Sequence, residues 1–288
     1  MITASPKICP SGSYEPTTAD ILIVKQYFKL FSIPLPDELV DDIIDAACYW
    51  AHSSITVDRS AVVHAGDMMY MRTLPLAVYN TEGDFLLEER GLLEEGFVLG
   101  GLPPTELKWV PPTLAKPFRK IEFQLWSHDQ GWVGVQGSLP GTYNGSYSWF
   151  DVDVERLDPT SCFTESIRWP SSLLFTAVDA PNLPDDITFT RKDVKCPFLP
   201  SPSTLQKNIV AERQTSHHTI TWTDLDNVEE GSSDAIAAEN RGQGWKSYDG
   251  SFVRDLQVGD CITLWMRARF PGWMNNAVKA KITVFWAV

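Results

Sequence analysis

The amino-acid sequence predicts a mainly β protein, an antiparallel β-sandwich of the jelly-roll type with a small helical hairpin near the N-terminus. Alternating apolar and polar runs, bounded by turn residues, recur from residue 54 to the end of the chain. Helical spacing is confined to residues 18–52. A strand-like segment also occurs twice. These features favour sheet layers over a helical core, arranged as one large sandwich or as two related sandwiches.

The repeated segment covers residues 120–132 and 261–273. In each copy an alternating strand runs into a polar turn that ends in Gly-Trp, with Ile121 matching Ile262 and Trp132 matching Trp273. A second aromatic strand follows each copy, at residues 147–152 and 282–288. The repeat predicts a sheet architecture built from related halves or tandem β domains, in which many of the 11 tryptophans are structural.

Two short helices are expected before the strands. The first starts at Thr18-Ala19-Asp20 and carries apolar residues at helical spacing, namely Ile21, Val24, Phe28 and Phe31. Prolines then interrupt the chain, and Pro36-Asp37-Glu38 starts the second helix. Its expected buried stripe is Leu39, Ile43, Ala46, Ala47 and Trp50, with Asp41, Asp42 and Asp45 facing outward.

The remaining elements divide the chain into four parts. We expect strands at 54–57, 61–64 and 68–76, an ambiguous segment at 86–101, and hinges at Pro103-Pro104 and Pro111-Pro112. Pro197 to Pro202 marks the best boundary, and a polar loop is expected at 224–242. The predicted parts are a flexible arm at 1–17, the helical hairpin at 18–53, a β-sandwich region at 54–200, and a second β region at 201–288 that completes or repeats the sandwich.

Composition narrows the class of partner. The net charge of −13 disfavours nucleic acid and anionic membranes, and no apolar run reaches the roughly 20 residues that span a bilayer. Five cysteines without a Cys-x-x-Cys pair, and a start without signal-peptide features, favour a reduced, cytoplasmic location. Phosphate-loop and dinucleotide fingerprints are missing, and His217-His218 lack metal-ligand spacing. We therefore expect no cofactor and no metal, and the oligomeric state is left open.

Several motifs resemble those of a group of uncharacterised proteins from filamentous fungi. These are Ser127 to Trp132, Ser148 to Phe150, Asp249 to Arg254, Val258 to Asp260, Arg269 to Trp273 and Trp286 to Val288. The resemblance covers roughly residues 18 to 52 and 68 to 288 and implies kinship without an activity. The run from Leu256 to Ala268 is similar, over a shorter stretch, to late strands of galactose-binding-like jelly rolls.

The repeated strand ends supply the candidate ligand site. Aromatic faces beside amide, carboxylate and guanidinium groups suit a sugar or a peptide. The candidate residues are Trp126, His128, Asp129, Gln130, Trp132, Arg267, Arg269 and Trp273. The structural alternative is that Gly-Trp closes a corner of the sandwich while Asp129 and Gln130 satisfy turn amides.

Three functions follow from these patterns. The first is non-catalytic recognition of a glycan, peptide or protein through loops 127–146 and 224–250. The second is an enzyme that uses His128 and Asp129 with nearby arginines, which requires another titratable group within hydrogen-bond reach. The third is a ubiquitin-ligase substrate adaptor, because Leu35 to Leu39 followed by Ile43-Ile44 resembles the start of an F-box. That function requires an exposed apolar face on residues 18–52.

Overall fold

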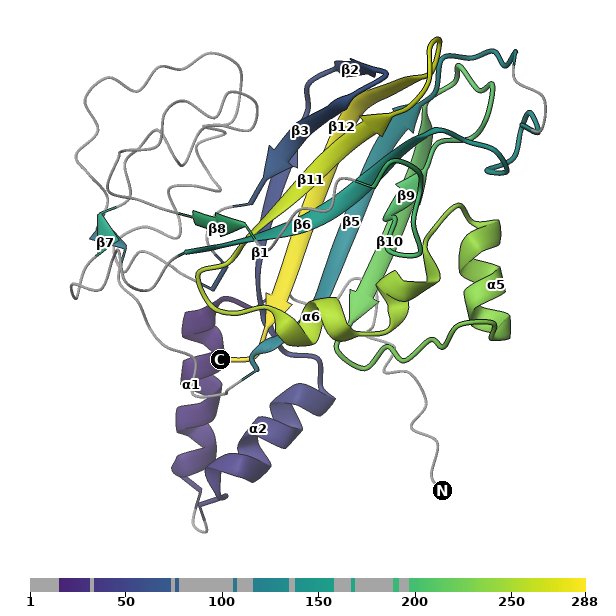
Figure 1. The fold of residues 1–288 in the computed structure, drawn as a ribbon. Helices are drawn as coiled ribbons and strands as arrows, with labels where there is room; N and C mark the ends of the chain where they lie inside the picture. The colour runs from purple at the N-terminus through teal and green to yellow at the C-terminus, as the bar shows by residue number, and fades with distance from the viewer. Residues whose placement is uncertain are drawn as a thin grey trace.

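Two antiparallel sheets face each other and enclose the core (Figure 1). The computed structural model describes residues 16–31, 34–73, 76–77, 106–107, 116–134, 138–157, 167–168, 189–191 and 197–288. The prediction of a mainly β antiparallel sandwich with N-terminal helices is confirmed. The segment 86–101, the four hinge prolines and the arm up to residue 15 lie outside the described residues.

Sheet A has the strand order β1-β12-β5-β10, and β2 also pairs with β12. Its strands are β1 (Ala51–Val57), β2 (Ala61–His64), β5 (Phe118–His128), β10 (Ser216–Thr223) and β12 (Met274–Trp286). Sheet B has the order β3-β11-β6-β8, and β9 also pairs with β6. Its strands are β3 (Asp67–Arg72), β6 (Ser148–Leu157), β8 (Phe189–Arg191), β9 (Gln206–Lys207) and β11 (Cys261–Ala268). A separate pair joins β4 (Glu106–Leu107) to β7 (Ile167–Arg168).

Each copy of the repeat contributes one strand to each sheet, but the two copies do so in the opposite order. β5 in sheet A is followed by β6 in sheet B, whereas β11 in sheet B is followed by β12 in sheet A. β5 pairs with β12, and β6 pairs with β11. Both copies therefore belong to the same sandwich. Because side chains alternate along a strand, the matched residues Ile121 and Ile262 both point into the shared core, where each is fully buried.

The helical hairpin lies at the lower end of the sandwich in Figure 1 and consists of α1 (Thr18–Lys29) and α2 (Asp37–Ala46). The expected buried stripe is wrong for α2 itself, because Val40 and Ile44 are buried whereas Leu39 and Ile43 are exposed. Of the residues expected in the stripe, Trp50 is buried as predicted. Two aspartates that were expected to face outward form ion pairs with neighbouring elements, and these ion pairs determine which face of α2 is buried. Asp41 binds Lys25 of α1 at 2.6 Å, and Asp45 binds Arg119 of β5 at 2.8 Å.

The expected polar loop at 224–242 contains a helix. α5 (Ser233–Asn240) begins after Ser232, whose hydroxyl accepts a hydrogen bond from the Ala235 N–H, as a helix cap does. The 3-10 helix η1 (Trp245–Tyr248) and the short helix α6 (Ser251–Asp255) follow. The pair His217-His218 lies within β10.

Candidate functional site

The structure does not bring the eight candidate residues together in one cluster. Trp126 and His128 lie on the outer face of sheet A, while Arg267 and Arg269 belong to sheet B and its following loop. The remaining four lie in the two Gly-Trp turns at one end of the sandwich. The reason is that the first strand of one copy lies in sheet A and the first strand of the other copy lies in sheet B. Equivalent residues of the two copies therefore lie in opposite sheets, and the outer faces of the two sheets point in opposite directions.

Trp126 is enclosed by its neighbours on sheet A. Its indole stacks on His217 of β10, with 4.2 Å between ring centroids and 8° between planes. On β12 the Lys279 ammonium lies 5.5 Å from the Trp126 ring centroid. A sugar ring stacks on an open aromatic face. Since His217 already covers one face of Trp126, this side chain is a poor platform for a glycan.

Asp129 and Gln130 hydrogen-bond to the backbone of the loops. The Asp129 carboxylate is fully buried and accepts the N–H groups of Gly131 at 2.7 Å, Ala211 at 2.6 Å and Glu212 at 3.0 Å. The Gln130 amide donates to the Trp132 carbonyl and accepts from the Met274 N–H. Burial raises the pKa of Asp129 although these three amides oppose the shift. Both side chains therefore tie the β5–β6 turn to neighbouring segments, as in the structural alternative.

His128 makes a contact of the same kind. Its Nδ1 lies 2.7 Å from the Asp129 carbonyl oxygen. Within the described part of the chain, neither His128 nor Asp129 forms a hydrogen bond with another titratable side chain. The acid–base geometry that an enzyme built on these two residues requires is therefore missing from their contacts.

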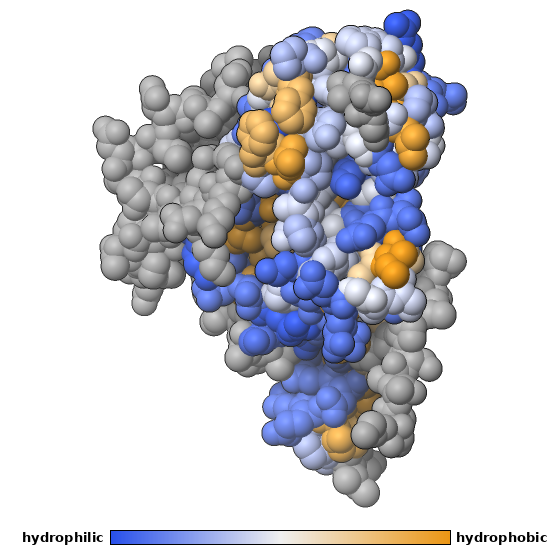
Figure 2. All heavy atoms as spheres, turned by 45° about the vertical axis from the view of Figure 1, so that its right-hand side comes forward, coloured by the Kyte–Doolittle hydropathy of each residue, from blue (hydrophilic) through white to orange (hydrophobic). Residues whose placement is uncertain are grey.

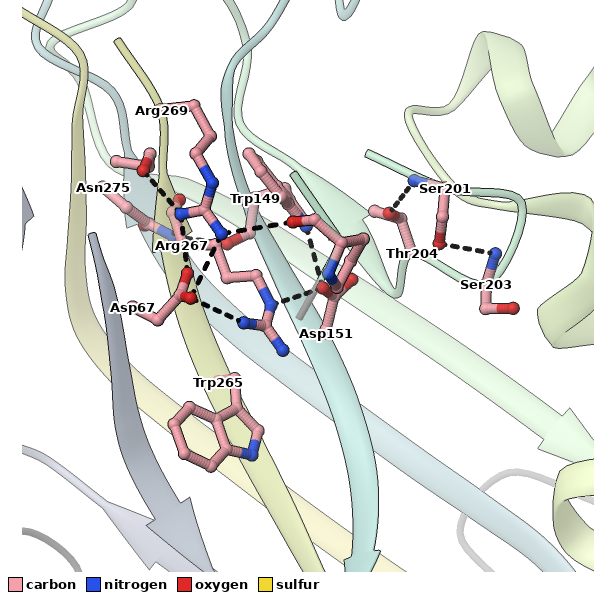
Figure 3. Close-up of polar contacts among 12 residues, drawn as sticks. Asp67, Trp149, Asp151, Ser201, Ser203, Thr204, Trp265, Arg267, Arg269 and Asn275 are labelled. Carbon is pink, nitrogen blue, oxygen red and sulfur yellow. Dashed lines mark hydrogen bonds and ion pairs between the residues drawn. The ribbon is translucent and has the colours of Figure 1, made fainter. Parts of the chain in front are cut away.

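Arg267 occupies a buried charge cluster on the outer face of sheet B (Figure 3). Its Nε donates to Asp151 Oδ2 at 2.5 Å, and its guanidinium forms an ion pair with Asp67 at 3.1 Å. Asp151 also accepts the Trp149 indole N–H at 2.9 Å. Arg269 binds the other side of Asp67 at 2.7 Å. The two arginines and two aspartates thus neutralise one another across β3, β6 and β11.

The pKa shifts in this cluster follow from its burial. Desolvation raises the pKa of Asp151, and Arg267 only partly opposes that shift. Burial also acts on Asp67, but hydrogen bonds and charge from Arg269 and Arg267 hold its pKa below the ordinary value. Arg269 further donates to the carbonyls of Gly66, Pro197 and Ala268. The two guanidinium groups are committed to the fold.

Exposed apolar side chains gather at the same end of the sandwich as the Gly-Trp turns. The rings of Phe198 and Phe270 meet edge to face at 5.7 Å, and the Trp132 indole lies over Gly272, two residues beyond Phe270. We call this the loop-end aromatic surface; its members and exposed fractions are Trp132 (50%), Phe198 (66%), Leu199 (45%) and Phe270 (39%). Figure 2 shows that exposed apolar side chains form separate patches on the face in view.

The backbone around this surface is held in unusual conformations. Phe270 has a φ of 68°, which is rare for a bulky residue and requires support from its surroundings. Its ring packs edge to face on Tyr147, which in turn packs on the buried Trp273. Gly272 has a φ of 90°, and a Cβ there would lie 2.8 Å from the Trp132 ring. These contacts hold Phe270 at the surface.

Sequence reasoning found part of this surface. It selected Trp132 and the neighbouring Trp273 and Arg269, of which Trp132 is exposed and Trp273 is buried. It missed Phe198 and Leu199, which fell in the proline-rich segment interpreted as a domain boundary. Two adjacent large apolar residues between prolines were the available signal, because a plain linker is usually polar.

We also searched the described residues for membrane-spanning helices and for metal sites. None of the helices there is long and apolar enough to cross a membrane. No three His, Cys, Asp or Glu side chains in the same residues gather closely enough to hold a metal ion. Comparisons with protein-family models, with curated proteins and with solved structures find nothing that matches this chain.

Proposed function

We propose that this chain is a non-catalytic recognition protein whose loop-end aromatic surface binds a peptide or protein segment. The observation that carries the proposal is the exposure of four large apolar side chains on neighbouring loops, one of which is the strained Phe270. Exposed aromatic residues on a supported scaffold are typical anchors of protein interfaces. The buried free thiol of Cys261 accords with a cytoplasmic location, which forms part of the proposal.

The chemistry of the surface favours a protein partner over a glycan. Sugar recognition needs polar groups beside an aromatic face to fix the hydroxyls. Here the nearby polar groups of Asp129, Gln130 and Arg269 are bound to backbone or to Asp67. What stays accessible is largely hydrocarbon, which is better matched by apolar side chains of a peptide.

The size of the surface suits a modest interface. From their exposed fractions, the four side chains present on the order of 400 Å² of apolar area. Burying this area would contribute about 10 kcal/mol before the entropy of association is subtracted. We therefore expect binding in the micromolar range, about −8 kcal/mol, rather than a permanent complex.

A phage-displayed library of random peptides tests the proposal. Selection on the wild type should recover peptides with aromatic or aliphatic anchors, and titration calorimetry should show a negative heat-capacity change. The double variant Phe198→Ser/Phe270→Ser should weaken the selected peptides by at least about tenfold, which corresponds to ~1.4 kcal/mol.

The matched control is Leu225→Ser/Ile236→Ser, which removes two comparably exposed apolar side chains outside the loop-end aromatic surface. It should leave peptide affinity unchanged. If the selected peptides bind the Phe198→Ser/Phe270→Ser variant as tightly as the wild type, the proposed surface is wrong.

The helical hairpin supports the substrate-adaptor hypothesis as a second candidate. That hypothesis requires an exposed apolar face on residues 18–52, and α1 carries one. Ile23, Tyr27 and Leu30 share a helix face at i, i+4 and i+7, and Tyr27 and Leu30 are 63% and 78% exposed. Three apolar anchors at this spacing are typical of a helix that docks in a groove.

The adaptor candidate is tested with the purified ligase subunit that F-box helices bind. Biolayer interferometry should detect binding to the wild type and its loss in Tyr27→Ser/Leu30→Ser. The control Leu225→Ser/Ile236→Ser again carries matched changes elsewhere. Absence of binding to the wild-type chain would exclude this second function without affecting the first.

A further inference from the structure

Arg213 lies beside the loop-end aromatic surface. It precedes β10, whose first residue, Ser216, pairs with Ser127 near the end of β5. Figure 1 shows the start of β10 and the β5–β6 connection at the same upper end of the sandwich. The inference drawn from this arginine rests on the proposed function, because it concerns the chemistry of the partner that this surface binds.

Two glycines provide the space in which Arg213 and Trp132 lie. A Cβ at Gly131 would overlap with Arg213 Cγ and lie 2.7 Å from Arg213 Nε, so the arginine side chain crosses directly over the Gly131 backbone. Trp132 is the next residue, and its indole lies over Gly272 in the same way. The arginine side chain and the indole therefore belong to one continuous surface.

Arg213 is an exposed cation without a counter-ion. Its guanidinium forms no hydrogen bond and no ion pair in the part of the chain that the structure describes. The carboxylates of the same two loops are bound elsewhere. Asp129 is buried and accepts three backbone N–H groups, and Glu212 accepts the Gln214 N–H at 2.9 Å. The N–H donors of the Arg213 guanidinium are thus available to a partner.

The cation near Phe198 is neutralised instead. The Arg269 guanidinium lies 6.0 Å from the centroid of the Phe198 ring, but it is paired with Asp67 at 2.7 Å and donates to the Pro197 carbonyl. The loop-end aromatic surface therefore has an uncompensated positive charge beside Trp132 and a compensated one beside Phe198. This asymmetry gives the surface a charged side and a neutral side.

A carboxylate is the group that best fits the charged side. A guanidinium binds a carboxylate through two parallel hydrogen bonds, and an apolar neighbourhood strengthens their attraction. The net charge of −13 repels anions in general. At physiological ionic strength, however, charges act mainly within about 8 Å, so Arg213 determines the preference for a group that lies beside Trp132.

We infer that the partner segment carries an acidic residue beside its aromatic or aliphatic anchors. The anchors cover Trp132, Phe198 and Phe270, and the acidic side chain binds the Arg213 guanidinium. Successive residues of an extended peptide are about 3.3 Å apart, so the acidic residue lies within about three residues of the anchor that covers Trp132. Arg213 thereby sets the charge selectivity of the surface.

The phage-displayed random-peptide library tests this selectivity. Peptides selected on the wild type should contain Asp or Glu beside their anchors more often than the unselected library does. Selection on Arg213→Glu should lose this enrichment and favour Lys or Arg at the same place. The control is Lys246→Glu, which makes the same change of charge at an exposed lysine of η1 and should retain the preference for acidic peptides.

A double-mutant cycle measures the contact itself. The tightest peptide from the wild-type selection is compared with a version in which its acidic residue is replaced by the corresponding amide. Fluorescence anisotropy should show that this replacement weakens binding to the wild type about threefold to tenfold, and that it leaves binding to Arg213→Gln unchanged. Since Arg213 is exposed, the urea midpoint of the variant should equal that of the wild type.

The outcomes separate this inference from the proposed function. If the wild type selects peptides without acidic enrichment, or if the amide replacement has the same effect on the wild type and on Arg213→Gln, the inference is overturned. The proposed function would then still be decided by the Phe198→Ser/Phe270→Ser variant. Failure of the wild type to select any peptide would overturn both.

Discussion

Replacing Asp129 by alanine should destabilise the fold by about 3 kcal/mol. The buried carboxylate accepts three backbone N–H groups, from Gly131, Ala211 and Glu212, at 2.6–3.0 Å. Each N–H left without a partner costs about 1–3 kcal/mol when buried. Two effects reduce the sum. The three donor residues are partly exposed, so water can reach them, and the substitution also removes a carboxylate that is unfavourably desolvated.

Urea unfolding followed by far-UV circular dichroism measures this change as a shift of the midpoint at constant slope. Asp129→Asn retains one acceptor oxygen, which can serve Gly131 and Glu212, so its loss should be about 1–2 kcal/mol. Asp42→Ala, an exposed change on α2, should stay within about 0.5 kcal/mol.

A loss below about 1 kcal/mol for Asp129→Ala, with an unchanged slope, would refute this reasoning. Asp129 would then not hold the two loops together. Its burial would need another explanation, and a role in ligand contact would be open again.

Three further outcomes follow from buried groups. Burial lowers the pKa of His218 to about 4, so its contribution is complete above the unfolded value of 6.5 and is lost as pH falls from 6.5 to 4. That loss is at most about 3 kcal/mol, and less because the ring is partly exposed; His218→Gln should flatten the stability profile in this window. Arg267→Ala leaves the buried Asp151 carboxylate without its ion-pair partner and should lower the free energy of unfolding by about 3–5 kcal/mol. The double variant Arg267→Met/Asp151→Leu should recover at least half of this loss, as measured by urea unfolding. Burial raises the pKa of Cys261 to about 12, so alkylation of the native protein at pH 8 should leave this thiol unlabelled in peptide mapping, and labelling as fast as in urea would contradict its burial.

The candidate site illustrates how far a linear pattern reaches. Trp132 was selected because it ends a repeated Gly-Trp turn, and it is exposed; its counterpart Trp273 has the same local sequence and is buried. The difference lies in the surroundings. Trp273 packs under Tyr147, whereas Trp132 lies over the backbone of Gly272. Neither contact is encoded within the turn itself.

Helix α2 shows the same limit within one element. Its apolar residues include both Val40 with Ile44 and Leu39 with Ile43, and each pair lies on one face of a helix. The periodicity alone therefore allows two orientations. The ion pairs of Asp41 with Lys25 and of Asp45 with Arg119 select the first, since both carboxylates then meet their cations.

By itself the sequence determined the class of the fold and the alternating strands of the repeat, because alternation along a strand is a local property of the backbone. Only the tertiary structure decided that β5 and β11 lie in opposite sheets, and hence that Trp126 and Arg267 belong to opposite faces. It also decided that Phe198 joins Phe270 at the surface and that Arg213 lies over Gly131. These outcomes depend on strand pairing and loop packing between residues far apart in the chain, which local periodicity does not specify.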